Sequence, residues 1–164
     1  MGIRKKIIIV SDSHGRNGNL WSIIEREKPI DMLIHCGDIE GCEYIYSQAA
    51  ECPVHMVTGN NDFFSDLPAE KEFTIGKNKV WLTHGHNYYV SVGNEFLKDE
   101  AKDRGADIVM YGHIHRPVVD GSKGIWAINP GSLTYPRQEG RKPSYIIMEV
   151  DEKGEASFKV KYLA

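Results

Sequence analysis

Residues 6–14 read KIIIVSDSH, an apolar and mostly β-branched run that stops at a serine and an aspartate. Consecutive apolar residues without a polar alternation predict a short strand that is buried on both faces. Such strands belong to parallel sheets whose faces are covered by helices. The turn-rich residues 11–19 then lead into a helix predicted over 20–28, which Pro29 ends. The stretch therefore predicts an α/β fold.

The same order of elements recurs along the chain. Two more buried strands, over 32–35 and 54–57, flank a helix predicted over 43–50. This repetition predicts right-handed crossovers and a largely parallel sheet. The second half predicts a hairpin around a glycine-containing turn, one further α/β unit and a C-terminal meander. These elements are expected over 72–75 and 79–83 (the hairpin), 93–104 and 108–111 (the unit), and 124–128, 144–150 and 156–162 (the meander).

Length and composition fit one globular domain. The 164 residues are 41% hydrophobic and 26% charged, which argues against disorder and against a disulfide scaffold. The formal net charge of −3 gives no broad attraction for nucleic acid or an anionic membrane. Three cysteines without a C-x-x-C motif imply neither a disulfide framework nor a zinc knuckle. The apolar run at 7–10 is too short for a signal peptide, so a cytoplasmic protein is expected.

Five predicted strands end in residues that can bind metal ions. The clusters are Asp12-Ser13-His14, Gly37-Asp38, Gly59-Asn60-Asn61-Asp62, His84-Gly85-His86 and Gly112-His113-Ile114-His115. In open α/β sheets the ligand crevice lies beyond the carboxyl ends of the strands, so these clusters are expected to converge. In an extended chain, residues two apart point to one side, which would pair Asp12 with His14 and His113 with His115.

A single cluster of this kind is more often an ordinary turn or helix cap than a site. Five clusters are different, because each would leave buried polar groups unpaired unless a partner such as a metal ion were present. Carboxylate, amide and imidazole donors suit Mn, Fe, Zn, Co or Ni better than Ca or Mg. Asp38 stands on a separate strand and is the natural carboxylate to bridge two ions.

The clusters D-x-H, G-D, G-N-x-D, H and G-H-x-H resemble those of the calcineurin-like metallophosphoesterases in order and spacing, over nearly the whole chain. Asn129-Pro130-Gly131-Ser132 also resembles a signature of the small single-domain phosphodiesterase branch. The resemblance implies a single domain over 1–164, built as a four-layer αββα sandwich of two mixed β-sheets flanked by helices. It also implies two divalent transition-metal ions, with Mn preferred over Ni, Co, Fe and Zn. The first would be held by Asp12, His14, Asp38 and His115, and the second by Asp38, Asn60, His84 and His113.

By this resemblance the protein is a metal-dependent phosphodiesterase that hydrolyses small phosphodiesters with a hydroxide shared by two ions. The alternative is a metal-binding scaffold or protein-interaction module on the same fold, as in the retromer scaffold subunit. All seven expected ligands are retained, which favours the enzyme. A nucleotide-binding loop at 11–19 is disfavoured, because neither G-x-x-x-x-G-K-[ST] nor G-x-G-x-x-G is present. No extended nucleic-acid binding and no membrane partner are expected, and a homo-oligomer is left open.

One position departs from the family's protein phosphatases, which carry a histidine after the ligand asparagine. Here Asn61 cannot titrate, so general acid catalysis by this position is lost. We expect a preference for activated or aryl leaving groups, with Asn61 bonding to phosphate. His86 is either a substitute acid or a histidine outside the reaction.

The remaining histidines, arginines and tryptophans of interest are expected to be structural. His35 and His55 lie inside predicted strands and are expected to be core residues. Arg16 and Arg137 could contact substrate, but exposed arginines are usually only solvated, and that is the expectation for both. The tryptophans, Trp21, Trp81 and Trp126, are expected in the core or at an interface.

Overall fold

The computed structural model describes residues 4–63 and 65–163 of the chain, which form two five-stranded sheets. The first sheet has the order β10-β9-β1-β2-β3, with β1 Lys5–Val10, β2 Met32–His35, β3 Val54–Met56, β9 Ser144–Val150 and β10 Ala156–Tyr162. The second has the order β4-β5-β6-β8-β7, with β4 Glu70–Ile75, β5 Asn78–Thr83, β6 Ile108–Met110, β7 Pro117–Asp120 and β8 Trp126–Pro130. The helices are α1 Gly18–Glu27, α2 Glu43–Ala50, α3 Glu95–Asp103 and a short 3₁₀ turn, Ser122–Gly124.

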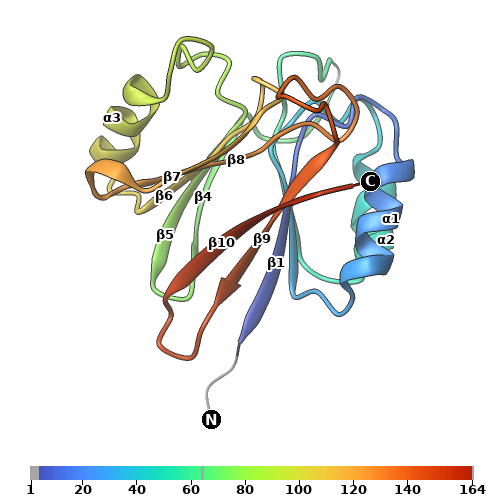
Figure 1. Ribbon diagram of the computed structural model, residues 1–164, viewed down its shortest axis with the longest axis horizontal. Coiled ribbons are helices and arrows are strands. Elements are labelled where there is room, and N and C mark those ends of the chain that lie inside the picture. Colours follow the sequence, from blue (N-terminus) through green and yellow to red (C-terminus); the bar gives the residue numbers. More distant parts are fainter. Residues whose placement is uncertain (1–3, 64, 164) are drawn as a thin grey trace.

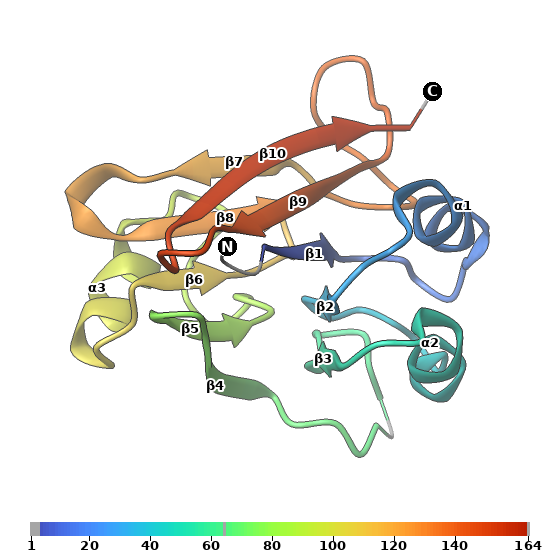
Figure 2. The ribbon, with the colours of Figure 1, turned by 90° about the horizontal axis from the view of Figure 1, so that it is seen from below.

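The sheets pack face to face with helices outside, as Figure 2 shows: α1 and α2 cover the first sheet and α3 covers the second. One apolar cluster fills the space between the sheets and includes Ile7, Ile9 and Leu82. Two further clusters join each sheet to its helices. The predicted four-layer αββα sandwich is confirmed.

Strand β1 holds the centre of the first sheet. Ile7 and Ile9 face the second sheet, while Ile8 and Val10 face α1 and α2, and all four side chains are completely buried. β1 runs parallel to β2 and antiparallel to β9. The predicted strand buried on both faces is therefore correct, and its parallel partner delivers two chain ends to the same edge of the sheet.

The structure corrects the prediction for the C-terminal half in two places. β8 does not form a meander with β9 and β10, because it joins the second sheet beside β6, whereas β9 and β10 form a hairpin in the first. Strand β7 was not predicted; it is a short edge strand that begins with a proline and leaves Val119 partly exposed, so it has no continuous apolar signal.

No helix in the described part of the chain is both long and apolar enough to span a bilayer. The cytoplasmic setting stays a prediction.

A buried carboxylate ties α1 to the first sheet. The Glu27 side chain, about 5% exposed, accepts hydrogen bonds from the Tyr145 hydroxyl and from Lys161 Nζ at 2.9 Å, and Lys6 Nζ lies 3.0 Å from its other oxygen. Burial alone would raise the pKa of Glu27, but the hydrogen bonds from Tyr145, Lys161 and Lys6 outweigh it and lower the pKa from 4.5 to about 2. A lowered pKa means that the ionised carboxylate stabilises the fold at neutral pH.

We predict that Glu27→Gln lowers the free energy of unfolding at pH 7 by about 2–3 kcal/mol, because the variant loses a charged acceptor for two lysines. The difference between variant and wild type should shrink as pH falls from 4.5 towards 2, where the wild-type carboxylate becomes protonated. Urea unfolding at pH 7 and pH 3 measures this. Glu25→Gln, an exposed position on the same helix, is the control. An equal loss at both pH values would contradict the assignment.

Candidate metal centre

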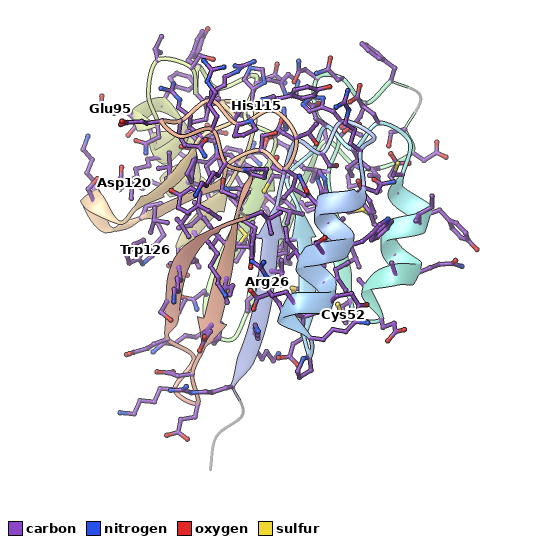
Figure 3. The ribbon with its side chains drawn as sticks, turned by 45° about the vertical axis from the view of Figure 1, so that its right-hand side comes forward. Arg26, Cys52, Glu95, His115, Asp120 and Trp126 are labelled. Atoms are coloured by element: carbon purple, nitrogen blue, oxygen red, sulfur yellow. The ribbon has the colours of Figure 1, made fainter. Side chains whose placement is uncertain are left out.

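The polar clusters meet at one end of the sandwich. β1 is parallel to β2, and β5 is parallel to β6. The loops that follow these strands gather at the top of Figure 1. Figure 3 labels His115 at the same end of the molecule. A cavity of about 380 Å³ opens there. Its lining residues are His14, Asp38, Asn60, Asn61, His113, His115, Tyr135 and Arg137.

Asp12, His14, Asp38 and His115 form a first ligand group. Each offers one donor atom, and the four donor atoms all lie within 4.8 Å of one another. Asp12 Oδ1 is 3.2 Å from His115 Nε2 and 3.7 Å from His14 Nε2, and Asp38 Oδ2 is also 3.7 Å from His14 Nε2. The structure thus brings together the four residues predicted for one ion.

The residues expected to hold the second ion, Asp38, Asn60, His84 and His113 (the second ligand group), lie beside the first group as two close pairs. His84 Nε2 lies 3.4 Å from Asp38 Oδ2, and His113 Nδ1 lies 3.1 Å from Asn60 Oδ1. The His84 and His113 rings are 5.3 Å apart between centroids. Asp38 Oδ2 therefore faces a histidine of each group, His14 on one side and His84 on the other.

A carboxylate and two backbone carbonyl groups orient three of these imidazoles. His14 Nδ1 lies 2.8 Å from Glu40 Oε2, His84 Nδ1 lies 2.8 Å from the Cys36 carbonyl oxygen, and His115 Nδ1 lies 2.8 Å from the carbonyl oxygen of Tyr135. Each Nδ1 therefore donates its proton outward and leaves Nε2 facing Asp12 or Asp38. Histidines that bind metal ions are commonly held in this way.

One oxygen at the centre lacks a hydrogen-bond donor. Asp12 Oδ2 accepts bonds from the Ser11 hydroxyl at 2.6 Å and the His113 backbone N–H at 3.1 Å. Asp12 Oδ1, fully buried, has no hydrogen-bond partner among the described residues, and neither has His84 Nε2, 3.7 Å away. An unpaired buried carboxylate oxygen is costly, and a cation between these atoms would satisfy it. The residues present therefore fit divalent metal ions.

The charges at this centre also favour a cation. Burial alone would raise the pKa of both carboxyl groups, but His115 and His84 outweigh it at Asp12, and His84 and Asn61 do so at Asp38, so both pKa values lie below the ordinary range. Burial lowers the pKa of His84, but Asp38 and Asp12 reverse this and raise it to about 9. Both carboxylates are thus ionised at neutral pH, and a metal ion must displace the proton of His84.

The ligands converge through left-handed backbone and not through extended chain as predicted. Positive φ angles occur at Asp12 (53°), His14 (48°), Asp38 (60°), His113 (75°) and His115 (58°). This region is unfavourable for residues with a side chain and persists only where surrounding structure enforces it. Tight turns follow each strand because several backbone N–H groups bond to neighbouring loops, for example Asp12 N–H to the Gly37 carbonyl at 3.0 Å.

Gly59 is needed because the Asp38 carboxylate lies against its backbone. A Cβ atom at Gly59 would lie 2.2 Å from Asp38 Oδ1 and 2.6 Å from the Asp38 nitrogen. Asp38 cannot retreat freely, since its Oδ1 accepts the Asn61 backbone N–H at 2.9 Å. Asp62, in the same G-N-x-D motif, accepts the backbone N–H groups of Asp38 and Gly59 at 2.7 and 2.8 Å and so holds both loops.

Several residues that position the site were not predicted to do so. Ser132 donates to the Asp12 carbonyl at 2.8 Å, and Asn129 donates to the Gly112 carbonyl at 3.0 Å. Both belong to the N-P-G-S motif, which thereby links β8 to the loops after β1 and β6. Glu40 was missed as well, and a lone acidic residue in a turn carries no signal for this role.

The proposed catalytic residues occupy different places. Asn61 lines the cavity, and its Nδ2 donates to Asp38 Oδ2 at 3.0 Å. His86 is exposed and is not among the residues that line the cavity, with its ring centroid 5.5 Å from that of His84 and 6.2 Å from that of His113. Burial and the neighbouring His84 lower the pKa of His86. At neutral pH it is therefore mostly without the proton that a general acid needs.

The structural expectations hold for one of the two core histidines. His35 is completely buried, with Nε2 2.9 Å from Ser13 Oγ and Nδ1 accepting the Gly37 N–H at 3.1 Å, and burial lowers its pKa to about 3. His55 is only half-buried and stacks on Phe73 at 3.9 Å, because β3 is an edge strand.

The arginines and tryptophans match their expectations only in part. Arg16 is exposed, but its guanidinium lies over the Tyr135 ring, and Arg137 is exposed and lines the cavity. Trp81 is fully buried, but Trp126 is 40% exposed and packs on Phe158.

Comparison with known proteins agrees with this geometry. Residues 6–153 match the calcineurin-like phosphoesterase superfamily domain. The chain belongs to this superfamily. It is 36% identical over 146 residues to the probable metallophosphoesterase YsnB of Bacillus subtilis, covering 88% of this chain and 84% of that protein. A phosphodiesterase of Methanocaldococcus jannaschii is 28% identical over 144 residues, covering 77% and 82% of the two chains.

The fold is also shared with a protein whose name refers to vacuolar protein sorting and not to an enzymatic activity. Vacuolar protein sorting 29 from Cryptosporidium parvum superposes with a TM-score of 0.76 and 19% identity, covering 98% of each chain. At this identity the likeness concerns the fold alone. The match over residues 6–153 assigns this chain to the calcineurin-like family, and the structure adds a cluster of side chains that could bind a divalent metal ion.

We predict that Gly59→Ala weakens binding of Mn²⁺ by about 10- to 100-fold, the range seen when groups that hold a metal ligand are changed. The added methyl group must displace Asp38. Titration calorimetry measures the affinity, and thermal unfolding reports whether the variant is folded. Gly18→Ala is the matched control, because a Cβ there meets no atom within 4 Å. Unchanged affinity in folded Gly59→Ala would contradict the placement of Asp38 among the ligands.

Proposed function

We propose that this protein is a dinuclear metal-dependent phosphodiesterase acting on small phosphodiesters. The observation that carries the proposal is the buried, unpaired Asp12 Oδ1, faced by three imidazole nitrogens, from His14, His84 and His115, at 3.2–3.7 Å. The relative named phosphodiesterase supports this reaction class over the monoesterases of the wider family.

The two ligand groups would each hold one ion, with Asp38 shared between them and Mn²⁺ the preferred metal. Bound divalent ions would supply Lewis acidity and a nucleophilic hydroxide at neutral pH. The chain itself contributes placement. Asn61 holds both oxygens of Asp38 through its backbone and side-chain N–H groups, so that the shared carboxylate keeps one orientation.

In the part of the chain that the structure describes, this site has no well-placed group to donate a proton to the leaving group. Asn61 has no titratable proton, and His86 is exposed with a lowered pKa. Substrates whose leaving groups depart without a proton, such as aryl oxides, therefore suit the site best. This gives the asparagine two roles, holding Asp38 and bonding to a phosphoryl oxygen at the mouth of the cavity.

The alternative is a protein-interaction module, which the fold shared with vacuolar protein sorting 29 favours. A fold of this kind can be kept without catalysis. Metal binding alone does not separate the two functions, because a vacuolar protein sorting 29 of Entamoeba histolytica also has a structure in complex with zinc. The enzyme is the better supported function because the relative that is 36% identical to this chain is named a probable metallophosphoesterase.

We predict hydrolysis of bis(p-nitrophenyl) phosphate in the presence of Mn²⁺, faster than hydrolysis of p-nitrophenyl phosphate. Asp38→Asn and His84→Ala should each lower kcat/KM by about 100-fold or more, because losing a ligand costs more than losing a group behind it. His55→Ala, whose ring contacts Phe73 and Lys71, is the matched histidine control. A folded protein that binds metal but is inactive with Mn, Ni, Co, Zn and Fe would support the scaffold instead.

We also predict a steep fall in rate as the pKa of the leaving group rises, because general acid help worth about 100- to 10,000-fold is missing. A series of methyl aryl phosphodiesters with substituted phenols measures this slope. A flat dependence would show that a proton donor is present. In that event the same series is measured with His86→Ala. If the rate of the variant falls steeply with the pKa of the leaving group, His86 is the proton donor.

A further inference from the structure

The segment 132–137, called the wall here, contributes two side chains to the lining of the cavity, Tyr135 and Arg137, and the ligand groups use neither of them. Tyr135 and Arg137 line the cavity together with His14 and His115. The rest of the lining is made of histidine, asparagine and aspartate side chains, so the Tyr135 ring is the only large apolar surface among the described lining residues. It is 45% exposed.

Hydrogen bonds fix the backbone of this wall to the first ligand group. The Tyr135 N–H donates to Ser132 Oγ at 2.9 Å, and the Tyr135 carbonyl accepts from His115 Nδ1 at 2.8 Å. The Arg137 N–H donates to the His115 carbonyl at 2.9 Å, and Thr134 Oγ1 donates to the Ser13 carbonyl at 2.7 Å. The wall is therefore positioned before any ligand binds.

The Tyr135 ring itself is held from two sides. The Tyr135 and His14 rings meet at a steep angle with 5.4 Å between centroids, and the Arg16 guanidinium lies over one face of the Tyr135 ring, 5.3 Å from its centroid. A planar ligand would therefore stack on the other face. A ring held in this way can stack with a flat group at little cost in conformational entropy, and stacking on an aromatic side chain accepts any planar ring. A cavity of about 380 Å³ has room for a phosphoryl group and one such ring.

We propose that Tyr135 and Arg137 form a subsite for the ester group that the diester keeps, and that this group is a planar aromatic ring, either an aryl group or a nucleobase. The inference rests on the proposed function and names its substrate class. Tyr135 stacks with the ring, and the Arg137 guanidinium pairs with a phosphoryl oxygen, for which its planar donors are suited. The retained group is thereby placed on the side of His14 and His115.

The kinetic test keeps the leaving group constant and changes only the retained group. We expect Mn²⁺-loaded wild type to hydrolyse phenyl p-nitrophenyl phosphate with a kcat/KM about tenfold above that of methyl p-nitrophenyl phosphate. Tyr135→Leu should abolish this preference, and Tyr135→Phe should retain it. Arg137→Ala should lower kcat/KM for both substrates alike. Thymidine 5′-(p-nitrophenyl phosphate) separates the two sources: a further gain assigns a nucleobase, and no gain assigns an aryl group.

A binding measurement makes the subsite testable without turnover. Calorimetry should show phenylphosphonate binding about tenfold more tightly than methylphosphonate to Mn²⁺-loaded wild type, with no difference in Tyr135→Leu. That result without hydrolysis of any diester would overturn the proposed function and keep the subsite. Equal binding of the two phosphonates by wild type would overturn the subsite. An equal fall for both retained groups in Tyr135→Leu would overturn it too, because it would show that Tyr135 only positions His14 and His115.

Discussion

Two ionised carboxylates, Asp12 and Asp38, lie buried at the end of a parallel sheet, and most of the surrounding structure serves to make that arrangement stable. Their exposed fractions are 0% and 1%. Buried charges are tolerated only when they are paired. Hydrogen bonds satisfy three of the four oxygens, and the imidazoles face the fourth, Asp12 Oδ1, without donating to it. The fold therefore leaves Asp12 Oδ1, in the first ligand group, open to a cation, and His84 Nε2 of the second group lies 3.7 Å from it.

The sandwich provides this place because strand ends from both sheets meet there. β1 and β2 are parallel neighbours in the first sheet, and β5, β6 and β8 are parallel in the second, so their carboxyl ends emerge on one side. The end of β8 and the loop after it join the two sheets: Asn129, in β8, bonds to the loop that carries His113, and Ser132, in the following loop, bonds to the Asp12 backbone. Left-handed backbone then turns five of the seven expected ligands inward, and Asn60 and His84 are the two exceptions. The strain of the left-handed residues is stored locally and is offset by the packing of the strands behind them.

Much of this could be predicted from the sequence, because the signals are local. The KIIIV run is apolar without alternation, and only a strand buried on both faces requires that pattern. The ligands could be named because each follows such a run. Other features depend on contacts between distant segments. Glu40 contacts His14 although the two residues lie 26 positions apart in the sequence. β8 belongs to the second sheet because it pairs with β6, and no local sequence pattern predicts that pairing. The left-handed angles at Asp12 and His115 were missed for the same reason, since loops packed around them impose those angles.

The fold alone does not decide between catalysis and scaffolding, because the likeness to vacuolar protein sorting 29 covers nearly all of this chain. The decision rests on details finer than the fold: which oxygen lacks a donor, and what lines the cavity beside it. This cavity is lined by groups that bind metal or phosphate, with one aromatic ring at its side. Without a metal ion, the proton of His84 offsets part of the charge of Asp12 and Asp38. A cation that displaced this proton would also satisfy Asp12 Oδ1, and its positive charge would attract an anionic phosphate ester.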